Sequence, residues 1–82
     1  MTKFVVRKLG SRGDTCVAVA EEELADHLRP EFKQGFSAAL RAEGFSRFVG
    51  SDLEQVMAAV QGEVAKGVEE MEVLLIPRVA GG

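Results

Sequence analysis

The distribution of apolar residues divides the chain into strand-like and helix-like segments. Residues 4–9 and 15–20 are both rich in strand formers, and a glycine-containing turn of five residues separates them. Two such runs joined by a short turn predict a β-hairpin. We therefore expect the chain to begin with two antiparallel strands, the second of which carries Cys16 as a small buried thiol.

After residue 20 the apolar period becomes that of a helix. Pro30 disfavours helical geometry at the residue before it and suits the first position of a new helix. We therefore predict a short helix over 21–28 and a longer one over 30–43 that ends at Gly44. The apolar residues that recur every four positions, on one helical face, are Leu24, Leu28, Phe32, Phe36 and Leu40.

The second half of the chain combines a weak strand signal, a helix and a strong strand signal. Residues 45–49 predict a short edge strand. Ser51 and Glu54 have the spacing of a capping box, and the apolar stripe that follows predicts a helix over 52–66. The run over 71–77 is almost continuously apolar, which is typical of a central strand that is buried on both faces.

The order of these segments predicts one mixed sheet. The helices form the long crossover that lets the last strand run parallel to the first, in the middle of the sheet. The helical stripes then cover one sheet face, which gives a single two-layer α+β domain over residues 1–77. Residues 78–82 are expected to be a flexible tail, because glycine orders a chain end poorly.

Composition and charge argue against several classes of partner. The net charge of -3 gives no general attraction to nucleic acid or to an anionic membrane. The chain has five Phe and no Tyr or Trp, so it offers few aromatic side chains on which bases could stack. No apolar run approaches the roughly 18 residues of a membrane span, and the start lacks the apolar region of a signal peptide. We therefore expect a cytoplasmic chain with no nucleic-acid or membrane partner.

Side chains suited to catalysis are sparse. The only histidine, His27, has acidic neighbours on a predicted helix and is expected to be a solvated surface residue. Nucleophilic catalysis would need it beside a cysteine or serine, and no Cys/His set has the spacing of metal ligands. We expect no catalytic residue, no metal site and no bound cofactor in this chain.

The most specific feature is the end of the sequence. An apolar strand is followed by a proline and then by Arg78-Val79-Ala80-Gly81-Gly82. This ending resembles that of ubiquitin-like β-grasp proteins, and it is most similar to the sulfur carriers, such as the small subunit of molybdopterin synthase and the thiamine sulfur carrier. Those proteins usually have one main helix, so the second helix predicted over 52–66 is a departure from their pattern.

The resemblance implies a role for each residue of the tail. The carboxylate of Gly82, preceded by Gly81, would enter a narrow channel of an adenylating (E1-like) partner enzyme and be activated there with ATP. It would then carry sulfur, as a thiocarboxylate, to a sulfur-accepting enzyme, or be conjugated to a target lysine. Val79 and Ala80 would make positioning contacts, and Arg78 would be an ionic anchor for the partner.

A second interpretation of the same ending stays open at this point. The ubiquitin-like domain of lambdoid phage tail-assembly proteins has a similar Ile-Pro-Arg-Val-Ala-Gly stretch, and there the chain continues. In this alternative the protein is a non-conjugated interaction or assembly module, in which the last strand and the tail only dock.

Overall fold

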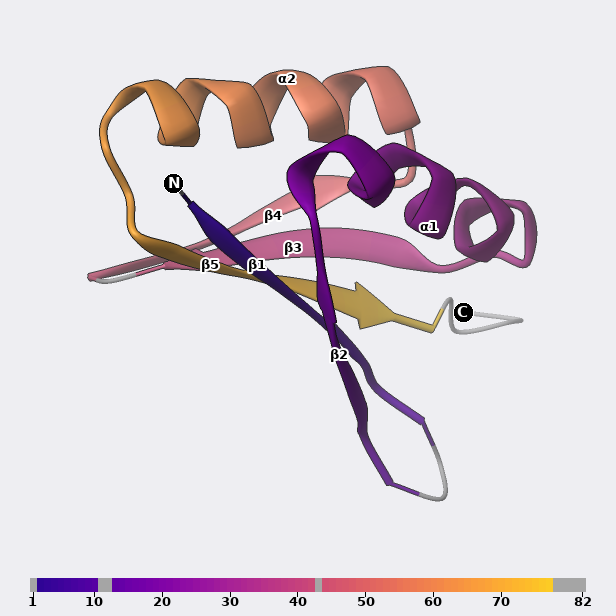
Figure 1. The fold of residues 1–82 in the computed structure, drawn as a ribbon. Helices are drawn as coiled ribbons and strands as arrows, with labels where there is room; N and C mark the ends of the chain where they lie inside the picture. The colour runs from indigo at the N-terminus through magenta and orange to yellow at the C-terminus, as the bar shows by residue number, and fades with distance from the viewer. Residues whose placement is uncertain (1, 11–12, 43, 78–82) are drawn as a thin grey trace.

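The fold consists of a mixed sheet with two helices on one face (Figure 1). The computed structural model describes residues 2–10, 13–42 and 44–77 of the 82-residue chain. The elements within these residues are β1 (Lys3–Lys8), β2 (Thr15–Val19), α1 (Glu21–Lys33), β3 (Ser37–Ala42), β4 (Phe45–Gly50), α2 (Leu53–Ala65) and β5 (Glu70–Ile76).

The sheet has the strand order β2-β1-β5-β3-β4. β1 is antiparallel to β2 and parallel to β5, and β3 is antiparallel to both β5 and β4. The predicted hairpin, the central parallel pair and the short edge strand over 45–49 are therefore confirmed. First and last strands that run parallel at the centre, with a hairpin at one side, make the arrangement β-grasp-like.

One helix occupies the region where two were predicted. α1 continues through Pro30 and ends at Lys33, and Gly35 follows with a φ of 99°, a backbone conformation that favours glycine. The predicted separation at Pro30 and the helix over 30–43 are therefore wrong. Pro30 lies in the last turn of α1 on its exposed side, so its missing N–H removes one hydrogen bond near a helix end.

Residues 37–42 form β3 rather than the end of a helix. Alanine and leucine have high helix propensity, which is why the apolar spacing here predicted a helix. In the structure β3 is paired on both sides, by β4 and β5, and Ala38 and Leu40 are fully buried. These pairings outweigh a helix preference of less than about 1 kcal/mol per residue. Gly44, expected to end a helix, lies in the turn between β3 and β4.

The second helix closely matches its prediction. α2 begins after Asp52, whose side chain accepts a hydrogen bond from the backbone N–H of Glu54 at 3.0 Å. Asp52 therefore caps the helix in place of Ser51, and its carboxylate also suits the positive end of the helix dipole. Gly67 follows the helix with a φ of 86°, again a conformation that favours glycine.

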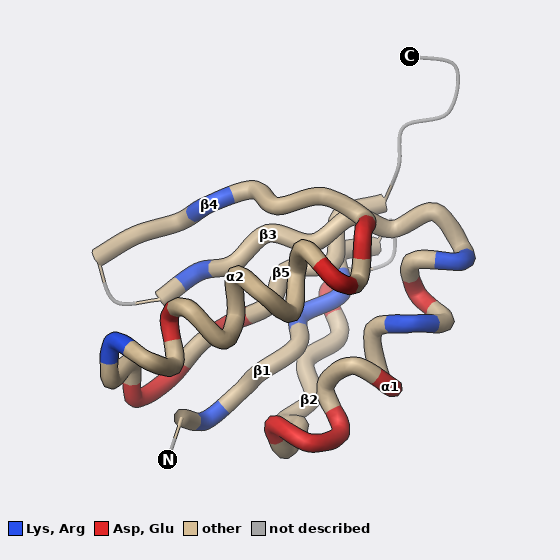
Figure 2. The backbone as a smooth tube through the Cα atoms, turned by 90° about the horizontal axis from the view of Figure 1, so that it is seen from above, with Lys and Arg blue, Asp and Glu red and all other residues tan. Residues whose placement is uncertain are grey.

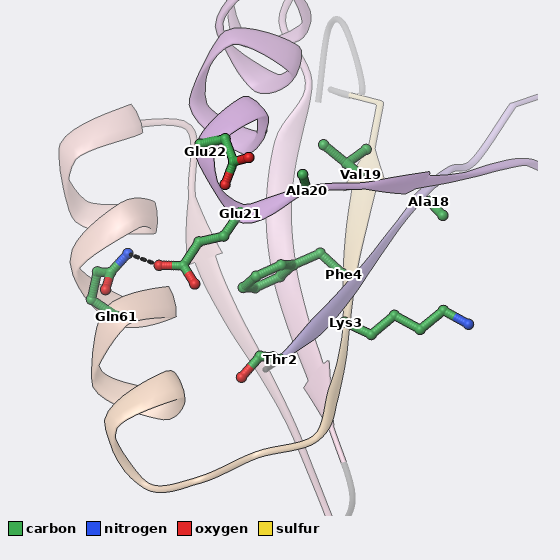
Figure 3. Close-up of a pocket in the computed structure, with 9 residues that line it drawn as sticks. All are labelled: Thr2, Lys3, Phe4, Ala18, Val19, Ala20, Glu21, Glu22 and Gln61. Carbon is green, nitrogen blue, oxygen red and sulfur yellow. Dashed lines mark hydrogen bonds between the residues drawn. The ribbon is translucent and has the colours of Figure 1, made fainter.

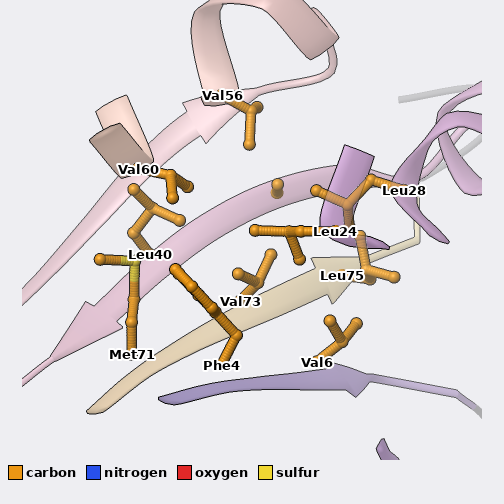
Figure 4. Close-up of a cluster of buried hydrophobic side chains, with 11 residues drawn as sticks. Phe4, Val6, Leu24, Leu28, Leu40, Val56, Val60, Met71, Val73 and Leu75 are labelled. Carbon is orange, nitrogen blue, oxygen red and sulfur yellow. The ribbon is translucent and has the colours of Figure 1, made fainter. Parts of the chain in front are cut away.

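The core lies between the helices and one face of the sheet (Figure 4). Alternate residues of the two central strands point toward the helices, because successive side chains of a strand lie on opposite faces. The leucines of α1 and the valines of α2 pack onto them. The largest fully buried side chains are Phe4, Val6, Leu24, Leu28, Leu40, Val56, Val60, Met71, Val73 and Leu75.

Replacement of Pro30 by alanine is expected to stabilise the protein. Proline inside a helix costs about 3 kcal/mol relative to alanine, part of which is offset because proline also restricts the unfolded chain. Pro30 is exposed, so its removal loses little packing. The free energy of unfolding, measured by urea titration, should rise by about 1–2 kcal/mol. An unchanged or lower value would show that the surrounding structure requires proline at this position.

Candidate functional site

The predicted tail residues lie outside the described part of the chain. They are Arg78, Val79, Ala80, Gly81 and Gly82, and their roles stay predictions from the sequence. The last described residue is Pro77, which directly follows β5. The described residues around the end of β5 therefore define the point from which the tail departs.

The end of β5 is held by backbone pairing and flanked by an ion pair. The amide of Leu9 donates a hydrogen bond to the carbonyl of Leu75 at 2.9 Å. Lys8, which pairs with Leu75 in the sheet register, places its Nζ 3.0 Å from Glu31 Oε2 and 4.7 Å from the centroid of the Phe36 ring. Main-chain hydrogen bonds on β1 and this contact with α1 give the tail a fixed point of departure.

The sheet face opposite the helices is covered by no described element (Figure 1). The register brings Leu74 opposite Ala39 and Ala39 opposite Phe48, so these side chains adjoin one another on this face. Phe48 is 65% exposed. Ala39 itself is buried. Leu74 and Phe48, on either side of it, form with Val5 and Ile76 an apolar surface that we call the open-face patch.

β5 is central, as predicted, but it is buried on one face only. Met71, Val73 and Leu75 are fully buried, whereas Leu74 and Ile76 on the other face are partly exposed. The expectation of two covered faces is therefore wrong. A sheet face that meets only water usually carries polar residues, so leucine and isoleucine at these positions make this face more apolar than an uncovered sheet face usually is.

Charged side chains lie on the same face beside the open-face patch. Glu72 Oε2 lies 3.4 Å from Arg7 Nη2, and Glu72 Oε1 lies 3.9 Å from Arg41 Nη1. Arg7 Nη1 lies 4.0 Å from Asp14 Oδ2. The Arg7 Nε and Glu72 Oε1 atoms are buried and have no hydrogen-bond partner among the described residues. The open face thus combines apolar area with a charged cluster whose hydrogen-bonding capacity is only partly used.

A hollow of about 720 Å³ lies at the other end of the sheet (Figure 3). It is lined by the starts of β1 and α1, by the end of β2 and by one residue of α2. Across it, Gln61 Nε2 donates to Glu21 Oε2 at 3.1 Å, which joins the two helices. Lys3, in its wall, pairs with Glu70 at the start of β5. The hollow is therefore a strand's length from Pro77 and separate from the departure point of the tail.

The chemically reactive side chains occupy unremarkable positions. Cys16 is exposed, so the expectation of a buried thiol is wrong: β2 is an edge strand and Cys16 points away from the helices. His27 is partly exposed on α1. Across residues 2–10, 13–42 and 44–77, no group of three or more His, Cys, Asp or Glu side chains is arranged to hold a metal ion. None of the described helices has the length and hydrophobicity needed to cross a membrane.

Two features of the sequence belong to the open-face patch, although neither predicted an exposed apolar surface. The continuous apolar run of β5 and the phenylalanine in the middle of β4 both mark it. Only the strand register, however, shows that they share a face.

Comparisons of the chain with protein-family models, with curated proteins and with solved structures give no match.

Proposed function

We propose that this protein is a small β-grasp-like carrier or modifier whose Gly82 carboxylate is adenylated by a partner enzyme with ATP. The observation that carries the proposal is where the Gly81-Gly82 pair occurs: a few residues beyond the central strand of a β-grasp-like sheet. β5 is paired on both sides, so the chain beyond Pro77 starts from a rigid support. Two residues without side chains suit a narrow enzyme channel.

The proposed chemistry takes place at the C-terminal carboxylate. A carboxylate oxygen attacks the α-phosphorus of ATP, pyrophosphate leaves, and the carboxylate becomes an acyl-adenylate. Hydrosulfide supplied by the partner then displaces AMP to form a thiocarboxylate, or a thiol displaces AMP to form a thioester, from which a lysine amine takes the acyl group and releases the thiol. The bond changes require groups of the partner enzyme, which agrees with the sparse catalytic side chains of this chain.

The open-face patch supports the proposal as the docking surface for the adenylating enzyme. Leu74 and Ile76 belong to β5 and precede the tail directly, so a partner seated on this patch also meets the tail. Exposed Phe48 provides an aromatic side chain of the kind that dominates binding energy at interfaces. The charges of Arg7 and Glu72 beside it would fix the orientation of the partner.

Replacement of Phe48 by serine is expected to weaken activation without unfolding the protein. Because the side chain is 65% exposed, the free energy of unfolding should change by no more than about 0.5–1 kcal/mol. Loss of an interface aromatic should lower the rate of ATP-dependent activation about tenfold or more. Val17→Ser, at an exposed apolar residue on the other face of the sheet, is the matched control and should keep the full rate. Equal rates for the two variants would exclude the open-face patch as the docking surface.

The activated terminus can be trapped chemically. The purified chain is incubated with an extract of the cells that produce it, with ATP and with hydroxylamine, which converts an acyl-adenylate into a hydroxamate. Mass spectrometry of the intact chain should show a C-terminal hydroxamate that requires ATP. Recovery of the free carboxylate alone, with ATP present, would contradict the carrier function.

The open-face patch also favours the second candidate, a non-conjugated interaction or assembly module. An exposed Phe48 beside partly exposed Leu74 suits a partner whether or not the tail is activated. In this case Phe48→Ser should disrupt the assembly, whereas removal of Gly82 should have no effect. The two variants together therefore separate the two functions.

A further inference from the structure

The side of α2 that points away from the sheet lies against no described element (Figure 1). We call this side the outer face of α2. Its exposed residues recur with the helical period, and those in its middle are small or uncharged, which leaves room for close approach of another helix. They are Glu54, Gln55, Ala58, Gln61, Gly62, Ala65 and, just after the helix, Lys66.

The fold of the chain itself does not explain the glycine at position 62. Gly62 lies inside α2, where glycine has the lowest helix propensity of any residue except proline. A Cβ at this position would meet nothing within 4 Å, and Gly62 is not among the glycines with a positive φ. Ala58, one turn earlier, is exposed as well. Small residues at these two positions let the axis of a second helix come as close as about 8 Å.

The charges near the ends of α2 suit a second, antiparallel copy of the helix. Glu54 lies in the first turn, Lys66 follows the last, and residues 55–62 carry no charge (Figure 2). In a symmetric antiparallel pair centred on residue 60, positions equally far from the centre in opposite directions lie beside one another. Glu54 is then beside Lys66 of the second copy, and Ala58 is beside its Gly62. Each contact forms twice.

The positions around the helix agree with this pairing. Gln61 donates a hydrogen bond to Glu21, so Gln61, and with it Glu54 two turns earlier, lies on the flank of the outer face toward α1. Lys66 lies on the other flank, where it lines a groove of about 530 Å³ between α2 and β4. The two-fold axis of an antiparallel pair places the α1 flank of one copy over the β4 flank of the other. Glu54 and Lys66 of different copies therefore meet on the same side of the crossing.

The charges that adjoin the outer face are compatible with the same pairing. Lys66 Nζ lies 3.2 Å from Glu63 Oε1 of its own chain, but the Lys66 side chain is 71% exposed and an ammonium has three donors, so one is left for Glu54 of the second copy. Arg47 lines the groove on the β4 flank and forms no ion pair with any described residue. Glu21 is on the α1 flank, so the axis brings Arg47 and Glu21 of different copies to the same side.

We propose that the outer face of α2 binds the same face of a second copy, which gives a weak, symmetric, antiparallel dimer. Ala58 and Gly62 lie at the crossing, and Glu54 pairs with Lys66 at each end. One pair of 13-residue helices buries less area than a stable dimer needs, so the dissociation constant should be about 10–500 µM. The dimer does not depend on activation of Gly82, and it leaves the open-face patch, on the other side of the sheet, accessible.

Sedimentation equilibrium of the full chain at concentrations from about 10 µM to 1 mM tests the self-association. The average mass should rise from that of the monomer toward that of the dimer, and it should rise less at high salt, because exposed charges are screened. In spectra of the ¹⁵N-labelled chain, the amides of Ala58, Gly62 and Ala65 should shift most between dilute and concentrated samples. A chain that stays monomeric over this range, or shifts confined to β2 or to the open-face patch, would overturn the proposal.

Substitutions separate the contact between copies from the fold. Gly62→Gln places a long side chain at the crossing but raises helix propensity, so it should weaken dimerisation about tenfold or more without lowering the thermal unfolding midpoint of the dilute monomer. Equally strong dimerisation of this variant would contradict the proposed crossing.

Charge exchange tests the antiparallel arrangement. Glu54→Lys should weaken dimerisation about tenfold, because it places two lysines together at each end, while Glu70→Lys, exposed on the other face of the sheet, should leave it unchanged. Addition of Lys66→Glu to Glu54→Lys exchanges the two charges and should restore most of the affinity. A double variant as weak as Glu54→Lys alone would exclude the pairing of these two residues.

Discussion

Deletion of Gly82 is expected to abolish ATP-dependent activation while leaving the fold intact. The new terminal carboxylate would fall one residue, about 3.5 Å, short of the reacting phosphorus, and misplacement by as little as about 1 Å can cost a hundredfold in rate. The buried core lies within residues 4–75, so the thermal unfolding midpoint should not change. The hydroxylamine trap and a thermal melt measure the two quantities on the same sample.

Two further variants show whether the effect comes from chain length and channel width. Gly81→Val should also prevent activation, because a β-branched side chain would fill a channel that accepts only backbone. Ala80→Gly preserves the length of the tail and removes one methyl group, so it should retain most of the activity. Normal activation of the Gly82 deletion variant would exclude Gly82 as the acyl donor.

Leu40→Ala is expected to cause the largest loss of stability. Leu40 is fully buried in the core beneath the helices, and deletion of such a side chain costs about 2–5 kcal/mol. A chain of this length has a total stability of about 4–12 kcal/mol, so the variant should be close to unfolding at moderate temperature. Urea titration monitored by circular dichroism gives the change in free energy.

Leu74→Ala is the matched control for the other face of the sheet. Leu74 lies on β5, the strand that pairs with the strand β3 of Leu40. Its side chain is on the opposite, open face of the sheet and is partly exposed. Its replacement should cost less than about 2 kcal/mol, because its side chain is only partly removed from water on folding. A loss equal to that of Leu40→Ala would show that the open face is buried in the protein in solution, as in an oligomer.

Local patterns were sufficient for most elements of the fold. The short runs of β-branched residues around Val6 and Val73, bounded by glycine or proline, indicate strands, and the apolar period around Val56 indicates a helix. The parallel pairing of the first and last strands followed from the order of these elements. Residues 38–40 were ambiguous, since Ala and Leu suit a helix by propensity and a strand by burial. Pairing with two neighbouring strands, which no local pattern encodes, decided the outcome.

The candidate functional residues also differ in whether the sequence alone reveals them. The Gly81-Gly82 pair is a sequence motif and needs no structure to be noticed. The open-face patch requires the register, because Phe48 and Leu74 are 26 positions apart and meet only through β3. Cys16 was expected to be buried because strand-like apolar runs usually are, but the same run at a sheet edge is exposed.

The most direct test of the central claim is the intact mass of the protein purified from the cells that produce it, with sequencing of its C-terminal peptide. The carrier function predicts a chain that ends at Gly82 and carries either a thiocarboxylate, seen as replacement of one oxygen by sulfur, or an isopeptide bond to a lysine. A chain that continues beyond Gly82, or one recovered solely with an unmodified carboxylate, would contradict it.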